Sequence, residues 1–251
     1  MYPKRYLDDY RTFSRTNRVF VAMPIKPAFE KRWERVFSPA IKKVGLKPWR
    51  ADSRSSGDSI QTEILKEIGQ AQLILVDIST DNLNRRNENV MYELGIAHAA
   101  RLPEEVIIVR SDKGPLPFDF TQIRVKQFNP TIISKAQAVI YTLLNDALLE
   151  IDYTKDLLVD RTIQSLDEDA LHVMLQEYTV ANKDINAPLR QFHPGPITYG
   201  HLKNPEFRAA LHRLHTLGVV AIDAYEHKKP ARYIWTDLGR AIIKKLMPDT
   251  P

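Results

Sequence analysis

The chain has no cysteine among its 251 residues. Disulfide bonds and cysteine-ligated metal sites are therefore excluded. No apolar run is long enough to span a bilayer, and the basic segment 1–18 lacks the apolar core of a secretory signal. With 43% apolar and 27% charged residues the composition is that of a globular protein, so we expect a cytoplasmic protein with no membrane partner.

The second half lacks an excess of positive charge. Residues 160–251 contain 12 Lys and Arg against 11 Asp and Glu, although the whole chain has a formal net charge of +5. The strongly basic footprint that usually marks nucleic-acid binding is therefore missing. Six of the seven histidines lie in this half. His212 and His215 are one helical turn apart, but the sequence places no third ligand beside them, and we expect no metal site.

One segment of the first half brings together a buried strand and two carboxylates. The run 73–76, Leu-Ile-Leu-Val, is typical of a strand buried on both faces of a parallel sheet, so Asp77 is expected at its carboxyl end. Open α/β sheets bind their ligands at that end. Asn89 is then predicted to cap a helix. The residues that share one side of this helix are Val90, Glu93, Leu94 and Ala97.

Glu93 is thus expected to face inward, near the ligand-binding end of the sheet. A carboxylate among apolar neighbours has to be paired, hydrogen-bonded or used. The structural explanation is a bond to free amides at its own helix start, or an ion pair with Arg85 or Arg86. The functional explanation is catalysis. Spacing alone leaves both open.

The remaining elements of the first half complete an α/β pattern. Further strands are predicted at 19–22, 105–109 and 123–128, and helices at 58–71 and 134–155. The fold class that follows is a Rossmann or flavodoxin-like parallel sheet over residues 1–155, with a boundary between 152 and 162. Arg110 and Asp112, after the strand 105–109, can contact a ligand phosphate or pair with each other, which is the commoner case for neighbouring charges.

Several of these residues recur in a known family. The pattern consists of Asp77, Asn87, Asn89, Val90, Tyr92, Glu93, Leu94 and Gly95. Together with a first strand that ends in the turn Met23-Pro24, it resembles the nucleoside 2-deoxyribosyltransferase-like proteins and their TIR-like relatives. The resemblance covers about residues 17 to 128.

The resemblance implies a role for each matching residue. The glutamate at the place of Glu93 attacks the anomeric carbon of a ribosyl group, or stabilises its positive charge, while the base leaves. Asp77 would position the base or the ribose. The further substrate-binding residues implied are Met23, Pro24, Asp52, Ser59, Asn87, Asn89 and Tyr92, of which Tyr92 either lines the cleft or packs.

Asn87 departs from the family's pattern. The transferases carry an aspartate six residues before the nucleophile, where it helps to protonate the leaving base. An amide can donate a hydrogen bond but cannot act as a general acid near neutral pH. Transfer between free bases is therefore less well supported than hydrolysis of a substrate with a good leaving group, such as the nicotinamide of NAD.

The second half has a different pattern, which begins with a helix at 205–217 that a glycine, Gly218, ends. Strand-like runs at 219–225 and 232–236 flank a turn and predict a hairpin, and Thr236 or Asp237 is expected to cap a last helix. This order resembles a winged helix-turn-helix over about residues 165 to 247. The side chains suited to nucleic-acid or partner contact are Arg208, His212, Arg213, Lys228 and Lys229. Because the half is nearly neutral, docking of a partner protein or self-association is the stronger reading.

We therefore expect two domains, 1–155 and 160–251, the first an N-glycosidase that cleaves the base–ribose bond of NAD or a related nucleotide. The order of the domains also resembles that of effectors of bacterial retron anti-phage systems. NAD or another nucleotide would be the substrate, with no cofactor, and a homo-oligomer is expected. The alternative from another class is a nucleotide sensor without turnover, coupled to a DNA- or partner-binding winged helix. A nucleotide-scavenging transferase ranks third because of Asn87.

Overall fold

The chain folds into two compact units, residues 1–152 and 153–251. The structure is a computed structural model, and it describes residues 15–51, 60–116, 124–181, 184–185, 189, 205–224 and 232–248. Each unit has its own hydrophobic core. Among the described residues, no helix is both long enough and apolar enough to cross a membrane.

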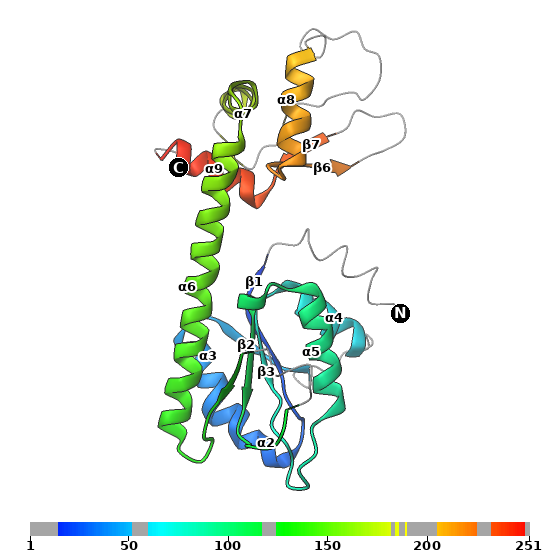
Figure 1. The fold of residues 1–251 in the computed structure, drawn as a ribbon, viewed down its shortest axis with the longest axis vertical. Helices are drawn as coiled ribbons and strands as arrows, with labels where there is room; N and C mark the ends of the chain where they lie inside the picture. The colour runs from blue at the N-terminus through cyan, green and yellow to red at the C-terminus, as the bar shows by residue number, and fades with distance from the viewer. Residues whose placement is uncertain are drawn as a thin grey trace. The chain divides into compact units, whose positions relative to one another are not determined.

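The first unit is built on a five-stranded, all-parallel sheet with the strand order β2-β1-β3-β4-β5 (Figure 1). The strands are β1 (Thr16–Ala22), β2 (Lys47–Trp49), β3 (Ala71–Asp77), β4 (Val106–Arg110) and β5 (Val125–Gln127). The predicted α/β fold class is confirmed. All five strands run in the same direction, but β2 is added on one side of β1 and β3 on the other, and the crevice for a ligand in such a sheet lies at the carboxyl ends of β1 and β3.

Helices cover both faces of this sheet, as Figure 1 shows. On one face lie α2 (Pro27–Arg32), a π-helical turn η1 (Trp33–Phe37), α3 (Ser38–Lys43) and the first part of α6 (Ile133–Ser165). On the other lie α4 (Ile60–Gln70) and α5 (Glu88–Ala100).

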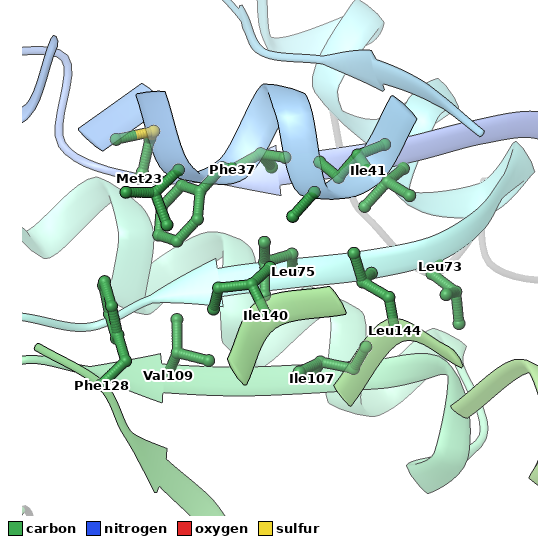
Figure 2. Packing of buried hydrophobic residues seen from close by; sticks show 14 of the residues in the cluster. Met23, Phe37, Ile41, Leu73, Leu75, Ile107, Val109, Phe128, Ile140 and Leu144 are labelled. Atoms are coloured by element: carbon green, nitrogen blue, oxygen red, sulfur yellow. The ribbon is translucent and has the colours of Figure 1, made fainter. Parts of the chain in front are cut away.

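Successive residues of β3 divide between these two faces. Leu73 and Leu75 belong to the core shared with Phe37 of η1 and Ile140 of α6, as Figure 2 shows. Ile74 and Val76 belong to the core on the side of α4 and α5. This explains the continuous apolar run in the sequence, because a strand covered on both faces needs apolar side chains in both directions.

Helix α6 is longer than predicted. It was expected to end near Lys155, but it continues to Ser165 and passes through the predicted boundary at 152–162. This stretch contains neither glycine nor proline to end a helix. Val159 and Thr162, three residues apart, are 5% and 6% exposed and give the extra turns a buried side in the second unit.

The second unit consists of helices and one hairpin. Besides the end of α6 it contains α7 (Glu168–Val180), α8 (Pro205–Thr216), β6 (Val220–Ala224), β7 (Arg232–Trp235) and α9 (Asp237–Leu246). Strands β6 and β7 pair antiparallel, as predicted. Gly218 ends α8 with a φ of +71°, in the left-handed region that glycine favours. Of the two predicted caps of α9 it is Thr236 whose hydroxyl accepts the Gly239 N–H, at 3.0 Å.

Helix α9 packs directly against the backbone at the start of the hairpin. A Cβ atom added to Gly239 would lie 2.2 Å from the carbonyl oxygen of Val219, whereas one added to Gly95 in α5 would have nothing within 4 Å. Only glycine therefore fits at position 239, and Gly95 can accept a larger residue.

These two glycines make a matched pair for a test of the packing. Gly239→Ala is expected to lower the free energy of unfolding by about 1 to 3 kcal/mol, since backbone atoms have to move apart. Gly95→Ala is expected to raise it by about 0.5 to 1 kcal/mol, because alanine favours the helix. Urea unfolding followed by circular dichroism measures both. Shifts of the same sign would contradict the close approach of α9 to Val219.

Candidate active site at the carboxyl edge of the sheet

Asp77, at the end of β3, is fully buried and fully engaged. One carboxylate oxygen, Oδ2, accepts a bond from Nη1 of Arg32 at 2.5 Å, and the other, Oδ1, accepts from the amide and the hydroxyl of Ser79 at 3.0 and 2.5 Å. Asp77 is 0% exposed. Its charge is thus neutralised by Arg32, and its side chain belongs to the face of the sheet that α2 covers.

The same network ties β3 to β4. Nη2 of Arg32 donates to the hydroxyl of Ser111 at 3.1 Å, and the Ser111 amide donates to the hydroxyl of Ser79 at 2.8 Å. The Arg32 guanidinium also lies over the rings of Phe29 and Phe128, with centroid distances of 4.6 and 5.3 Å. Residues from α2, β3 and β4 are thereby held at fixed positions at the carboxyl edge.

Glu93 has the opposite character. It lies on α5, beside the buried stripe of Val90, Leu94 and Ala97, and it is itself largely covered. Burial raises the pKa of its carboxyl to about 7. Within the described part of the chain no ion pair offsets this effect of burial. A partly buried carboxylate with a raised pKa and no cation beside it among the described residues is a candidate for a functional group.

The arginines expected to pair with Glu93 have other partners. Arg85 pairs with Asp81 at 3.4 Å, and Arg86 pairs with Asp112 at 3.3 Å and also donates to the carbonyl of Ile78. The structural explanation through these two arginines is therefore wrong. Asp112, bound by Arg86, also does not form the pair with Arg110 that neighbouring charges favour.

The cap of α5 also differs from the prediction. Asn87 caps the helix, with its side-chain oxygen accepting the Val90 N–H at 3.2 Å, whereas Asn89 lies in the first turn and is exposed. Sequence reasoning chose the wrong one of two asparagines, both of which suit a helix start. The side chain of Asn87 thus has a structural role.

The other predicted site residues are placed as follows. Met23 is 4% exposed and packs in the core beside Phe37 (Figure 2), and Pro24, which follows it, is buried. Tyr92 is 55% exposed on α5. Asp52 and Ser59 lie outside the described residues. Ligand contacts for all of these side chains stay predictions.

In the second unit the predicted contact residues lie on the exposed side of α8. Arg208, His212 and Arg213 are exposed, but Arg213 pairs with Asp167, the N-cap of α7. Lys228 and Lys229 lie outside the described residues. No group of three or more His, Asp or Glu side chains suited to a metal ion occurs in the described ranges.

Sequence reasoning missed Arg32, Ser79 and Ser111. Nothing local marks Arg32, which lies 45 residues before its partner Asp77. Ser79 carries a weak signal, since a serine two residues after an aspartate is a common side-chain turn.

Compared with known proteins, the chain matches no protein-family model, and no curated protein matches it.

The cap of α5 can be tested with the two asparagines. Asn87→Ala is expected to lower the free energy of unfolding by about 1 kcal/mol, and Asn87→Asp, which keeps the acceptor oxygen, to leave it nearly unchanged. Asn89→Ala is the matched control, with an expected change within about 0.5 kcal/mol. A larger loss from Asn89→Ala than from Asn87→Ala in urea unfolding would contradict the cap.

Glu93 should make stability depend on pH. Its pKa is 4.5 in the unfolded chain and about 7 in the fold. Because the folded state holds the proton more tightly, the free energy of unfolding falls as the pH rises from 4.5 to 7. Glu93→Gln has no titrating group at this position, so its free energy of unfolding should not fall in this way as the pH rises. It is expected to match the unsubstituted protein near pH 4.5 and to exceed its stability by about 2 to 3 kcal/mol at pH 8.

Urea unfolding at the two pH values measures this difference. Glu150→Gln is the control, since it makes the same change at an exposed position on α6. A Glu93→Gln variant that is less stable than the unsubstituted protein at pH 8 would show that the carboxylate has a stabilising partner.

Proposed function

We propose that the first unit is an N-glycosidase that cleaves the base–ribose bond of NAD or a related nucleotide, with Glu93 as the catalytic carboxylate. The observation that carries this proposal is the covered position of Glu93, with its raised pKa and without a counter-ion, on the helix that follows the central strand β3. The sheet order 2-1-3-4-5 supports it, because folds of this order bind their ligands, FMN in flavodoxin among them, at the carboxyl edge.

The chemistry matches an uncompensated carboxylate. As the glycosidic bond breaks, its electron pair leaves with the base and positive charge develops on the sugar. Glu93 would stabilise this charge or trap the sugar as an ester, and water would then add at the anomeric carbon and release a proton. An unpaired carboxylate gains most when a cation forms beside it, so its interaction is stronger in the transition state than with the ground state.

Asn87 supports nicotinamide as the leaving group. The side chain accepts the Val90 N–H and carries no acidic proton. A purine that leaves as an anion would need a general acid. Nicotinamide in NAD carries a positive charge while it is bound to the ribose and leaves as a neutral molecule, so it needs none.

The second unit would serve as a winged helix that docks a partner. Helix α8, the hairpin β6–β7 and α9 follow one another in the order of that motif. The pairing of Arg213 with Asp167 removes one of the cations from the exposed side of α8, which favours a protein partner over bare DNA. A homo-oligomer and a role as a restrained anti-phage effector belong to the same proposal.

The proposal is tested by mass spectrometry of products from NAD and a panel of nucleosides and nucleotides, with and without co-purified partners. Base release is expected to fall by about 1,000-fold in Glu93→Gln. Since the carboxylate form is required, the activity of the unsubstituted protein should fall as the pH drops through about 7. Glu88→Gln, exposed on the same helix, should keep its activity.

No product under any condition, with nucleotide binding unchanged by Glu93→Gln, would overturn the proposal and favour a sensor. An activity that rises as the pH falls below 7 would assign Glu93 as a general acid instead.

A further inference from the structure

Arg110 is a buried cation that the fold does not neutralise. It is the last residue of β4 and is 7% exposed. Within the part of the chain that the structure describes, its Nη1 has no hydrogen-bond partner, and its side chain forms no ion pair. Burial of an arginine in this way costs free energy, and native structures seldom leave such a group without a reason.

The position of Arg110 relates it to the candidate site. Residues two apart on a strand point to the same face of the sheet, so Arg110 shares the face of Ile108. Ile108 belongs to the core that Val90 and Leu94 of α5 complete. Arg110 therefore ends its strand at the carboxyl edge on the side that carries α5, the helix of Glu93.

Other charges at the carboxyl edge form ion pairs with each other, whereas Arg110 forms none with a described residue. Asp77 is bound by Arg32 at 2.5 Å, and Asp112 by Arg86 at 3.3 Å. Arg32 also leaves its Nε without a partner, but its charge is already balanced by Asp77. Among the described residues of this edge, Arg110 is thus the buried cation without a fixed anion, and a ligand can supply the opposite charge.

We infer that Arg110 binds a phosphate of the substrate, so that the site takes a phosphorylated nucleotide rather than a free nucleoside. A guanidinium offers donors in a planar fork that matches two phosphate oxygens. The inference deepens the proposed function, on which it rests, by naming the residue that binds the phosphate and by excluding free nucleosides as preferred substrates. Glu93 acts on the glycosidic bond, and Arg110 holds the phosphate.

Binding without turnover separates this inference from catalysis. In a Glu93→Gln background, isothermal titration calorimetry compares nicotinamide mononucleotide with nicotinamide riboside, which differ by one phosphate. The added substitution Arg110→Met is expected to weaken binding of the mononucleotide by about 10- to 100-fold and to leave the riboside unchanged. Arg124→Met, which removes a cation from an exposed position just before β5, is the matched control and should change neither.

Arg110→Met should fold, because it replaces a buried cation with an apolar side chain of similar length, and circular dichroism checks this. If Arg110→Met does not fold, Arg110→Lys serves instead. It keeps the positive charge but lacks the planar guanidinium, and it is expected to weaken binding of the mononucleotide several-fold. Equal affinities for the mononucleotide with and without the substitution would overturn the inference. Failure of the mononucleotide, NAD and pyrophosphate alike to bind the Glu93→Gln protein would also overturn it.

The two proposals can fail separately. Phosphate-dependent binding that Arg110→Met abolishes, in a protein that releases no base, would support the phosphate site and overturn the enzyme. Base release that is equally fast from nucleosides and nucleotides and insensitive to Arg110→Met would support the enzyme and overturn the phosphate site.

Discussion

The ion pair between Asp77 and Arg32 fixes the carboxyl edge of the sheet. The carboxylate is fully buried and is satisfied on both oxygens, by Arg32 and by Ser79. Removal of one partner from such a pair costs about 3 to 5 kcal/mol, because the other charge stays buried. Arg32 and Ser79 are each also hydrogen-bonded to Ser111, which follows β4. The ion pair therefore helps to set the positions of α2 and of the ends of β3 and β4. Any ligand at this edge meets an ordered frame.

Asp77 and Glu93, the two carboxylates that the sequence pattern singles out, differ in their surroundings. Both carboxylate oxygens of Asp77 accept hydrogen bonds from Arg32 and Ser79, and Arg32 balances its charge. Glu93 is covered without such a balance, and its pKa is raised to about 7 for that reason. A carboxylate with a raised pKa and no cation beside it among the described residues can interact with a positive charge on a ligand. Asp77 is fully buried and has a largely buried counter-ion, whereas Glu93 is partly exposed and has no ion pair among the described residues.

The sequence predicted what depends on local pattern. The apolar runs located β3 and β4, and helical spacing placed Glu93 beside the buried stripe of α5. It did not predict Arg32 as the partner of Asp77, since two residues 45 positions apart meet only through the packing of α2 on the sheet. It chose Asn89 over Asn87 as the cap, because both have the required side chain. The sequence pattern predicted the end of α6 near Lys155. The helix continues to Ser165 because Val159 and Thr162 are buried in the second unit.

Three features of the edge, taken together, restrict the ligand more than each does alone. Within the described part of the chain Glu93 has no cation beside it and Arg110 no anion, and in the proposed reaction Asn87 would offer no proton to the leaving group. A complementary ligand carries positive charge next to the bond that breaks, negative charge on a phosphate, and a base that leaves without protonation. Nicotinamide nucleotides have all three properties in one molecule, whereas a free purine deoxynucleoside has none. The same charges that would cost stability in the empty fold would then be offset in the complex, so ligand binding should stabilise this unit more than its contacts alone would suggest.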